Sequence, residues 1–348
     1  MNDSSYKYIV STSPHITSPR TTKRIMADVI IALVPALIAS FLLYGFYTLL
    51  MTAIAVAATV FGEYLFNLLR GRKHTVNDLS AVVTGIILGL NLPPTVPFYV
   101  PAIGGLFAAL IVKMLFGGIG KNFANPALTA RIFVMLAWTT AMTSFVAPID
   151  LSKGGMELFK YFNSDTVSAL TTATPLAGLK EGLTSSASAL DLFLGRIGGS
   201  AGEVSALAIL IGGVYLAARK VIDLKIPLLY VLTYFVVTCI IYKNASVAGL
   251  GILSGGLLFG AVFMATDYST SPNSFWGVVI YAVGCGILTA VFRKYSAMSE
   301  GVSYAILLMN IVTPLLDKYI RPRPFGYVKP VREKKERKVK RVKEVEAQ

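Results

Sequence analysis

A polar segment between long apolar stretches contains the hydroxyl groups best placed for chemistry. It contains the stretch Thr171-Thr172-Ala173-Thr174-Pro175. Proline biases the residue before it towards an extended backbone, and the small Ala173 leaves the Thr174 hydroxyl accessible to a modifying enzyme. Segments rich in serine and threonine usually form turns and caps, so composition alone indicates function only weakly. The pattern identifies Thr174 as the candidate residue for a covalent modification.

Five acidic residues lie inside or beside apolar stretches: Asp28, Glu63, Asp78, Asp267 and Glu300. A carboxylate in hydrocarbon costs about 2.5 to 3.5 kcal/mol on insertion scales, so it normally faces a cavity or a partner. Asp28 and Asp78 precede apolar runs, where helix capping accounts for them. Glu63 lies deepest within an apolar run. It is expected to have either a structural role or a role in an ion or proton path. Glu300 is expected either to cap a helix or to belong to a functional site, and the sequence favours the two equally.

A glycine-rich segment, 117–131, precedes and opens an apolar run. Pro126 suits a helix start, and Asn125 can cap the free amides there. Asn122 and Asn125 also offer donors and acceptors suited to the edge of a planar heterocycle. The segment is not a phosphate-binding Walker loop, because its lysine and hydroxyl spacing differs. A helix cap and a ligand contact both remain open for this segment.

The cysteines and histidines predict no metal site. Cys239 and Cys285 each lie inside an apolar run, and two thiolates cannot complete the four-ligand set of an iron-sulfur cluster. The only histidines are His15 and His74. We therefore predict two buried free thiols, no disulfide and no catalytic side chain in this chain alone.

The elements that position these residues are predicted to be membrane helices. Of the 348 residues, 55% are hydrophobic and only 14% are charged, which is too little polar surface for a soluble globule of this length. About ten apolar runs approach the length of a membrane span. They cover residues 26–44, 48–69, 79–92, 97–116, 127–147, 203–218, 226–242, 247–266, 275–292 and 301–317. The sequence predicts an all-α polytopic membrane protein.

Lysine and arginine in the short loops set the expected orientation. Basic residues follow the second, fourth, sixth and tenth runs, which places both termini in the cytoplasm. The segments 1–25 and 319–348 are then cytoplasmic, and the polar loop 148–202 is extracytoplasmic. Much of the net charge of +14 lies in the last segment, where acidic residues interleave without aromatic ones. This composition favours anionic lipid or a protein partner over nucleic acid.

Weak internal similarity divides the chain into two five-helix repeats, 26–147 and 203–318. Since five is an odd number, the two copies must be inverted relative to each other in the membrane. Such repeats place their working site near the midplane, between broken helices. The run 79–92 ends in Leu90-Asn91-Leu92-Pro93-Pro94, and the run that ends at Asp267 is followed by Pro272. Both are predicted to stop early or re-enter, and the alternative is two ordinary helix ends at the interface.

The segment that ends in Thr174 resembles the Ser/Thr-x-Ala-Thr flavinylation motif of a known family. The family comprises the D subunit of the Rnf complex and the B subunit of the sodium-translocating NADH:quinone reductase. Three further segments are similar, namely Arg72 to Pro94, Gly117 to Arg131, and Phe263 to Pro272. The likeness extends from about residue 20 to 325. The chain length favours the Rnf subunit, although Thr171 and Thr172 replace the common Ser-Gly.

This resemblance implies a subunit of a translocase, an ion-translocating ferredoxin:NAD oxidoreductase in the prokaryotic inner membrane. It implies FMN bound to Thr174 through a phosphoester, with Thr171 or Thr172 as weaker candidates, installed by a flavin transferase. A second, non-covalent flavin such as riboflavin is expected near Asn122 and Asn125. The implied partners are Rnf subunits A, B, C, E and G, which supply the ferredoxin and nicotinamide sites. Glu63, Asp78, Asp267 and Glu300 are the candidates for the ion path.

Two other functions are consistent with the same sequence. One is a cofactor-free channel or transporter, because the inverted five-span plan is similar to that of urea transporters and a fold does not determine a function. The other is a structural scaffold within a membrane complex. An unmodified Thr174 would favour either alternative.

Overall fold

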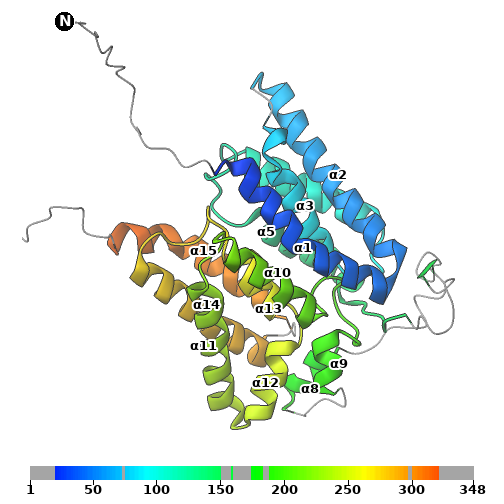
Figure 1. Ribbon diagram of the computed structural model, residues 1–348, viewed down its shortest axis with the longest axis vertical. Helices are drawn as coiled ribbons and strands as arrows, with labels where there is room; N and C mark the ends of the chain where they lie inside the picture. The colour runs from blue at the N-terminus through cyan, green and yellow to red at the C-terminus, as the bar shows by residue number, and fades with distance from the viewer. Residues whose placement is uncertain are drawn as a thin grey trace, which may run out of the picture.

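The computed structural model describes residues 20–72, 75–149, 158–159, 174–182, 188–296 and 300–320. Every regular element in this part of the chain is helical (Figure 1). The N-terminal half contains α1 (Thr22–Tyr44), α2 (Phe46–Leu69), η1 (Val76–Asp78), α3 (Ser80–Leu90), α4 (Tyr99–Phe107), η2 (Ala108–Met114), α5 (Pro126–Ala137) and α6 (Thr139–Thr143). The remainder contains α8 (Pro175–Lys180), α9 (Ala189–Leu194), α10 (Ala206–Ala218), α11 (Lys225–Tyr242), α12 (Ala245–Leu253), α13 (Leu257–Phe259), η5 (Gly260–Met264), α14 (Phe275–Tyr295) and α15 (Val302–Tyr319).

Four helices are long and apolar enough to cross a membrane: α1, α2, α11 and α14. A fifth candidate is the pair formed by 245–253 and 257–264, which bends by 65° between its halves. Shorter apolar helices cover Ser80–Leu90, Tyr99–Met114, Pro126–Ala137 and Ala206–Ala218. These elements confirm the prediction of an all-α polytopic membrane protein.

The described helices follow the predicted apolar runs with two differences. The expected span 127–147 is interrupted, because Trp138 leaves the helical conformation (φ −129°, ψ 56°) and a separate short helix, α6, follows. The expected span 247–266 bends at residues 254–256, where Gly255 adopts a positive φ of 66°. Glycine takes this conformation without the steric cost that other residues meet. The predicted early end of the run 79–92 before Pro93 is confirmed, since α3 stops at Leu90.

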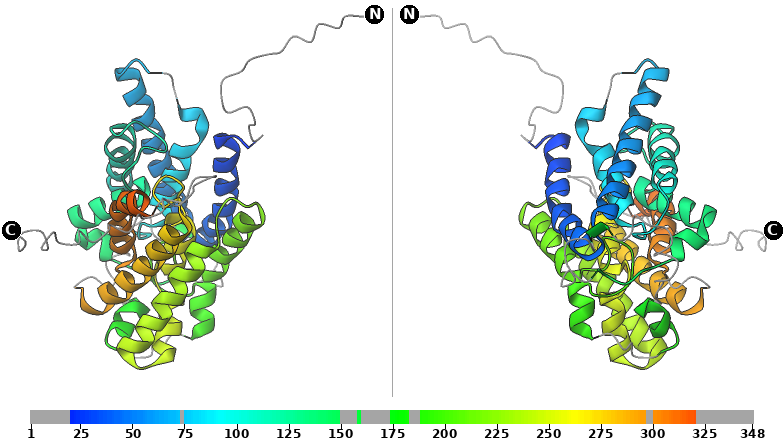
Figure 2. Two further views of the ribbon diagram at one scale, coloured as in Figure 1. Left: turned by 90° about the vertical axis from the view of Figure 1, so that its left-hand side faces the viewer. Right: turned by 90° about the vertical axis from the view of Figure 1, so that its right-hand side faces the viewer.

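The helices form two groups that meet along α1 and α10. In the first group α2 packs on α3 and α4, and in the second α11 packs on α12 and α14. Figures 1 and 2 show α1, α2 and α3 lying above α11, α12 and α14. In Figure 1 the start of α1 lies in the upper half and the end of α15 at the left, whereas α8 and α9 lie at the lower end. This arrangement places α8, which follows Thr174, far from the two ends of the described chain.

Glycines bring α3 close to α2. Gly85 and Gly89 are one helical turn apart, and a methyl group on either would lie 2.5 Å from Cα of Val56 or 2.6 Å from Cα of Thr52. Small residues at this spacing allow membrane helices to pack with their backbones in near contact. The Thr59 hydroxyl of α2 then reaches the carbonyl of Ala81 in α3 at 2.9 Å.

We expect Gly85→Ala to destabilise the protein by roughly 1 to 3 kcal/mol, the usual cost of overfilling a packed interior. The new methyl group must push α3 away from α2. Gly249→Ala is the matched control, because a methyl group on Gly249 in α12 meets no atom within 4 Å. Thermal unfolding of the two purified variants in detergent gives the comparison. Equal stability of the two variants would contradict this account of the α2–α3 contact.

Candidate functional site

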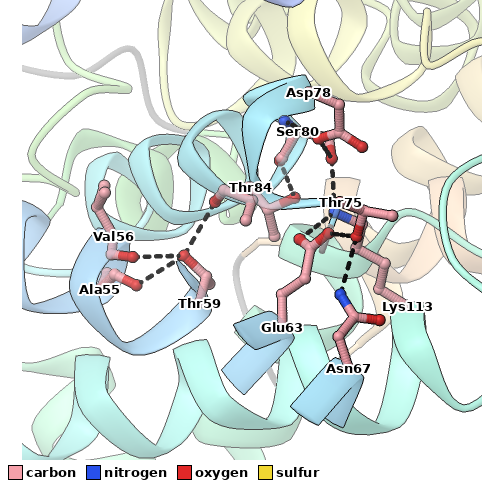
Figure 3. Close-up of polar contacts among 11 residues, drawn as sticks. Ala55, Val56, Thr59, Glu63, Asn67, Thr75, Asp78, Ser80, Thr84 and Lys113 are labelled. Atoms are coloured by element: carbon pink, nitrogen blue, oxygen red, sulfur yellow. Dashed lines mark hydrogen bonds and ion pairs between the residues drawn. The ribbon is translucent and has the colours of Figure 1, made fainter. Parts of the chain in front are cut away.

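A buried ion pair joins Glu63 of α2 to Lys113 of η2 (Figure 3). The Nζ atom of Lys113 lies 2.7 Å from Oε2 of Glu63, and the two side chains are 3% and 0% exposed. The same Nζ atom donates to the Ser80 hydroxyl at 2.5 Å. Lys113 is presented by a π-helical turn, a distortion that often occurs at functional sites. The prediction that Glu63 faces a partner is therefore confirmed.

Hydroxyl and amide groups extend this pair towards Asp78. The Thr75 hydroxyl donates to Oε1 of Glu63 and accepts from Nδ2 of Asn67 at 3.1 Å. Oδ1 of Asp78 accepts from the backbone N–H of Ser80 at 2.8 Å and from its hydroxyl. Two of the acidic residues predicted for an ion path thus belong to one polar network, in which Ser80 and Lys113 connect Asp78 to Glu63.

A cavity of about 90 Å³ lies beside this network and brings three of the predicted site residues together. Its lining includes Ser80, Lys113, Asn122, Asn125 and Asp267. These residues come from both helix groups, so the cavity lies where the two groups meet. The volume suits several water molecules, but it is smaller than the roughly 150 Å³ that accommodates benzene in an engineered protein core.

The two asparagines at this cavity differ in their bonding. Asn125 caps α5, since its Oδ1 accepts from the N–H groups of Ala127 and Leu128 at 3.1 and 3.3 Å, which confirms the predicted cap. Its Nδ2 donates to the Met264 carbonyl at 3.4 Å. Asn122, in contrast, has a buried Oδ1 with no hydrogen-bond partner among the described residues. Of the two, Asn122 offers the acceptor that a ligand could use.

Asp267 lies in the loop that follows η5. Its carboxylate accepts from the Ser269 hydroxyl at 3.1 Å and from the Thr270 hydroxyl at 3.4 Å. Burial raises the pKa of Asp267, and these hydrogen bonds only partly offset that effect. The group therefore retains a proton more readily than an ordinary aspartate.

A second buried charge cluster centres on Arg131 of α5. Its Nη1 atom lies 3.0 Å from Oε1 of Glu203, and its Nη2 atom pairs with Oε2 of Glu300. Nη1 also donates to the Ser303 hydroxyl at 2.6 Å. Oε1 of Glu300 accepts from the backbone N–H of Gly256 at 2.7 Å. Glu300 therefore does not cap its own helix; it links α5 to the bend between α12 and α13.

Thr174 lies directly before α8 with an extended backbone (φ −72°, ψ 146°), as the following proline predicts. Its side chain does not cap that helix. A cavity of about 30 Å³ is bounded by Thr174 together with Glu203 and Glu300. A larger cavity of about 950 Å³ shares Ser200 and Glu300 with it and is also lined by Arg131, Lys180 and Lys294. Thr171 and Thr172 lie outside the described residues.

Comparison with known proteins decides the family. Residues 9–326 match the family described as NQR2, RnfD, RnfE. The chain belongs to this family. It is 45% identical over 329 residues to the D subunit of the Na⁺-translocating ferredoxin:NAD⁺ oxidoreductase complex of Acetobacterium woodii, with 94% of this chain and 98% of that protein covered.

The names of two further relatives describe the translocated ion differently. The D subunit of the proton-translocating ferredoxin:NAD⁺ oxidoreductase complex of Clostridium ljungdahlii is 36% identical, with 92% of this chain and 96% of the relative covered. The D subunit of the ion-translocating oxidoreductase complex of Stutzerimonas stutzeri is 38% identical, with 87% and 92% covered. The similarity to these D subunits thus extends over nearly the whole chain.

Sequence reasoning missed three charged residues of this family member and misassigned one. Lys113, Arg131 and Glu203 are all nearly inaccessible, and Lys113 and Arg131 lie within predicted apolar runs. The rule that a charged residue within an apolar run faces a cavity or a partner applies to bases as well as to acids. Applied to lysine and arginine, it would have identified both cations. The interpretation of Asp28 as a helix cap is wrong, because α1 begins at Thr22 and Asp28 pairs at 3.4 Å with Arg219, which directly follows α10.

Both cysteines are free, and the prediction that both thiols are buried is confirmed for Cys285 only. Cys285 is buried in α14 and Cys239 is partly buried in α11.

Proposed function

We propose that this chain is the D subunit of an ion-translocating ferredoxin:NAD⁺ oxidoreductase of the Rnf type. The observation that carries the proposal is the similarity to a named D subunit along 94% of the chain. The membrane helices and the two buried charge clusters suit a subunit that moves ions while other subunits handle ferredoxin and NAD⁺. Subunits A, B, C, E and G are the proposed partners.

The proposal includes two inverted five-helix repeats, α1–α5 and α10–α15. One cation at a corresponding position in each half supports this repeat. Lys113 ends the fourth element of the first half and contacts the second and third elements through Glu63 and Ser80. Arg293 lies near the end of α14 and likewise contacts α11 and the end of α12, through the Tyr234 hydroxyl at 3.0 Å and the Ser254 carbonyl at 3.0 Å. A duplicated ancestor explains both arrangements.

Thr174 is the proposed attachment residue for FMN, through a phosphoester formed by a flavin transferase outside the cytoplasm. The described residues fit this group. The cavity of about 950 Å³ adjoins the small cavity at Thr174, and Lys180 and Lys294, which line it, offer positive charge to an anionic phosphodiester. The bound flavin would accept and donate electrons, while this chain holds the phosphate and sets the electrostatic environment.

The ion path is proposed to use the cavity between the helix groups. Lys113 and Ser80 line this cavity and contact Glu63 and Asp78, respectively. Asp267 also lines it. Glu300 belongs to the separate cluster near Thr174 and would act on the extracytoplasmic side. The second, non-covalent flavin near Asn122 and Asn125 stays a prediction. The cavity of about 90 Å³ is smaller than the roughly 150 Å³ that accommodates benzene, so in this conformation its residues do not fit a flavin ring system.

The orientation proposed from the loop charges is cytoplasmic for both termini and for the tail 319–348, in the prokaryotic inner membrane. Arg20, Arg24, Arg219 and Lys220 line one cavity, and this clustering of bases at one end of the molecule is typical of a cytoplasmic face that meets anionic lipid.

Reconstitution of the complex in lipid vesicles tests the function. Complexes with and without this chain would be supplied with reduced ferredoxin and NAD⁺, and the uptake of ²²Na⁺ and of protons would be followed separately. We expect complexes that contain the chain to accumulate one of these ions and those without it to accumulate neither. Equal ion accumulation in the absence of the chain would overturn the proposal.

A further inference from the structure

Two buried carboxyl groups face each other beside the proposed flavin threonine. Glu203 and Glu300 both contact Arg131. A methyl group on Gly256 would come within 2.6 Å of Oε1 of Glu203 and 2.7 Å of Oε1 of Glu300, so both oxygens converge on this glycine. Oε1 of Glu203 lies near the Arg131 guanidinium but accepts no well-aligned hydrogen bond from the described residues. Two carboxylates in this geometry repel, whereas a carboxylic acid beside a carboxylate forms a hydrogen bond.

The charges around the pair come from several neighbouring elements. The groups that face it are Arg131 of α5, Arg293 and Lys294 of α14, Tyr304 of α15, and Lys180 with Glu181 beside the larger cavity. Arg293 donates to the Tyr234 hydroxyl and to the carbonyls of Gly251 and Ser254. It therefore adds positive potential without pairing directly with either carboxyl group. Arg131 is the cation in direct contact with both, and its single charge balances one carboxylate rather than two.

We propose that Glu203 and Glu300 hold a single proton between them and exchange it with water in the adjoining 950 Å³ cavity. In this step a proton passes between water and a carboxylate oxygen; only O–H bonds form and break, and no electron moves. The role of this exchange in electron transfer rests on the proposed flavin at Thr174. When a group at Thr174 gains a negative charge, the protonated form of the pair is favoured. When that charge is lost, the pair releases the proton.

Burial and solvent access assign the two roles within the pair. Burial and the neighbouring Glu300 raise the pKa of Glu203, although Arg131 opposes them. For Glu300 burial acts in the same direction, but Arg131, the Gly256 N–H and Arg293 outweigh it and lower the pKa. The proton therefore resides mainly on Glu203. Glu300 is the more exposed of the two, at 11% against 3%, and lines the larger cavity, so it is the group in contact with water.

Infrared titration of the flavin-free Thr174→Ala protein tests the shared proton directly. We expect a carbonyl stretch of a protonated carboxyl group that shifts in D₂O, persists to neutral pH and disappears at alkaline pH. Glu203→Gln should abolish this signal. Asp223→Asn, at an exposed aspartate that pairs with Lys225 and does not line this cavity, should leave it intact. Persistence of the signal in both Glu203→Gln and Glu300→Gln, or its absence in the parent protein, would overturn the proposal.

Thermal unfolding against pH gives a second measurement on the same proteins and shows that they fold. A carboxyl group with a raised pKa binds its proton more tightly when folded, so its contribution is full at low pH and is lost as the pH rises through the folded-state pKa. The parent protein should therefore lose thermal stability from mildly acidic to alkaline pH. Glu203→Gln should show a flatter profile, and an unchanged slope would contradict the shared proton.

The link to the flavin requires the flavinylated complex. Proton uptake on flavin reduction, measured with a pH dye in weakly buffered vesicles, should fall in Glu203→Gln and remain in Asp223→Asn. Equal uptake in the two variants would remove the link to electron transfer. If the flavin is absent from Thr174, the infrared and thermal results still decide whether the proton is shared, so the two failures are distinguishable.

Discussion

Replacing Thr174 with alanine is expected to abolish covalent flavin on this chain. When the chain is expressed together with a flavin transferase, its band on a denaturing gel should fluoresce under ultraviolet light, and the Thr174→Ala band should be dark. The reason is chemical, since a phosphoester needs a side-chain hydroxyl and alanine has none. The extended backbone before Pro175 is independent of that hydroxyl, so the local structure should survive the change.

The matched control is Thr143→Ala. Thr143 lines the cavity of about 950 Å³ that we assign to the flavin, and its hydroxyl donates to the Thr139 carbonyl within α6. We expect its band to keep full fluorescence. A bright Thr174→Ala band would move the attachment to Thr171 or Thr172, and a dark parent band would remove the flavoprotein proposal and favour a cofactor-free transporter or scaffold.

Local rules in the sequence predicted the helices and the backbone at the candidate site. The extended conformation of Thr174 follows from Pro175, and the end of α3 at Leu90 precedes Pro93 by a few residues. The cap formed by Asn125 depends on the adjacent proline and the free amides of the same helix. Each of these features is determined by residues within one or two helical turns, which is why the pattern reveals them.

Such local rules do not predict which residues pair with the buried charges. Glu63 and Lys113 are 50 residues apart, and Arg131 meets Glu203 and Glu300 at separations of 72 and 169 residues. A sequence shows that a buried charge needs a partner, but the choice of partner depends on how the helices pack. The same limit explains the error at Asp28, whose pairing with Arg219 requires α1 to contact α10.

Removing one member of the Glu63–Lys113 pair is expected to have the largest effect on stability. The two groups are almost fully buried and 2.7 Å apart, so either single change leaves a charge without its counter-ion. Such losses cost about 3 to 5 kcal/mol in buried pairs. Glu63→Gln and Lys113→Met should each lower the free energy of unfolding by this order, measured by chemical denaturation in mixed micelles. The double variant should recover most of the loss, because it leaves no buried charge at this pair.

The same three variants separate a structural role of Glu63 from a role in ion transport. The glutamine of Glu63→Gln can still accept from the Thr75 hydroxyl, but it has no charge to attract a cation. We expect reconstituted complexes with Glu63→Gln to keep their flavin and to transport ions more slowly per electron transferred. If the pair only stabilises the fold, the double variant should restore both stability and ion coupling. Restored stability without restored coupling would instead place the charged pair of Glu63 and Lys113 on the ion path.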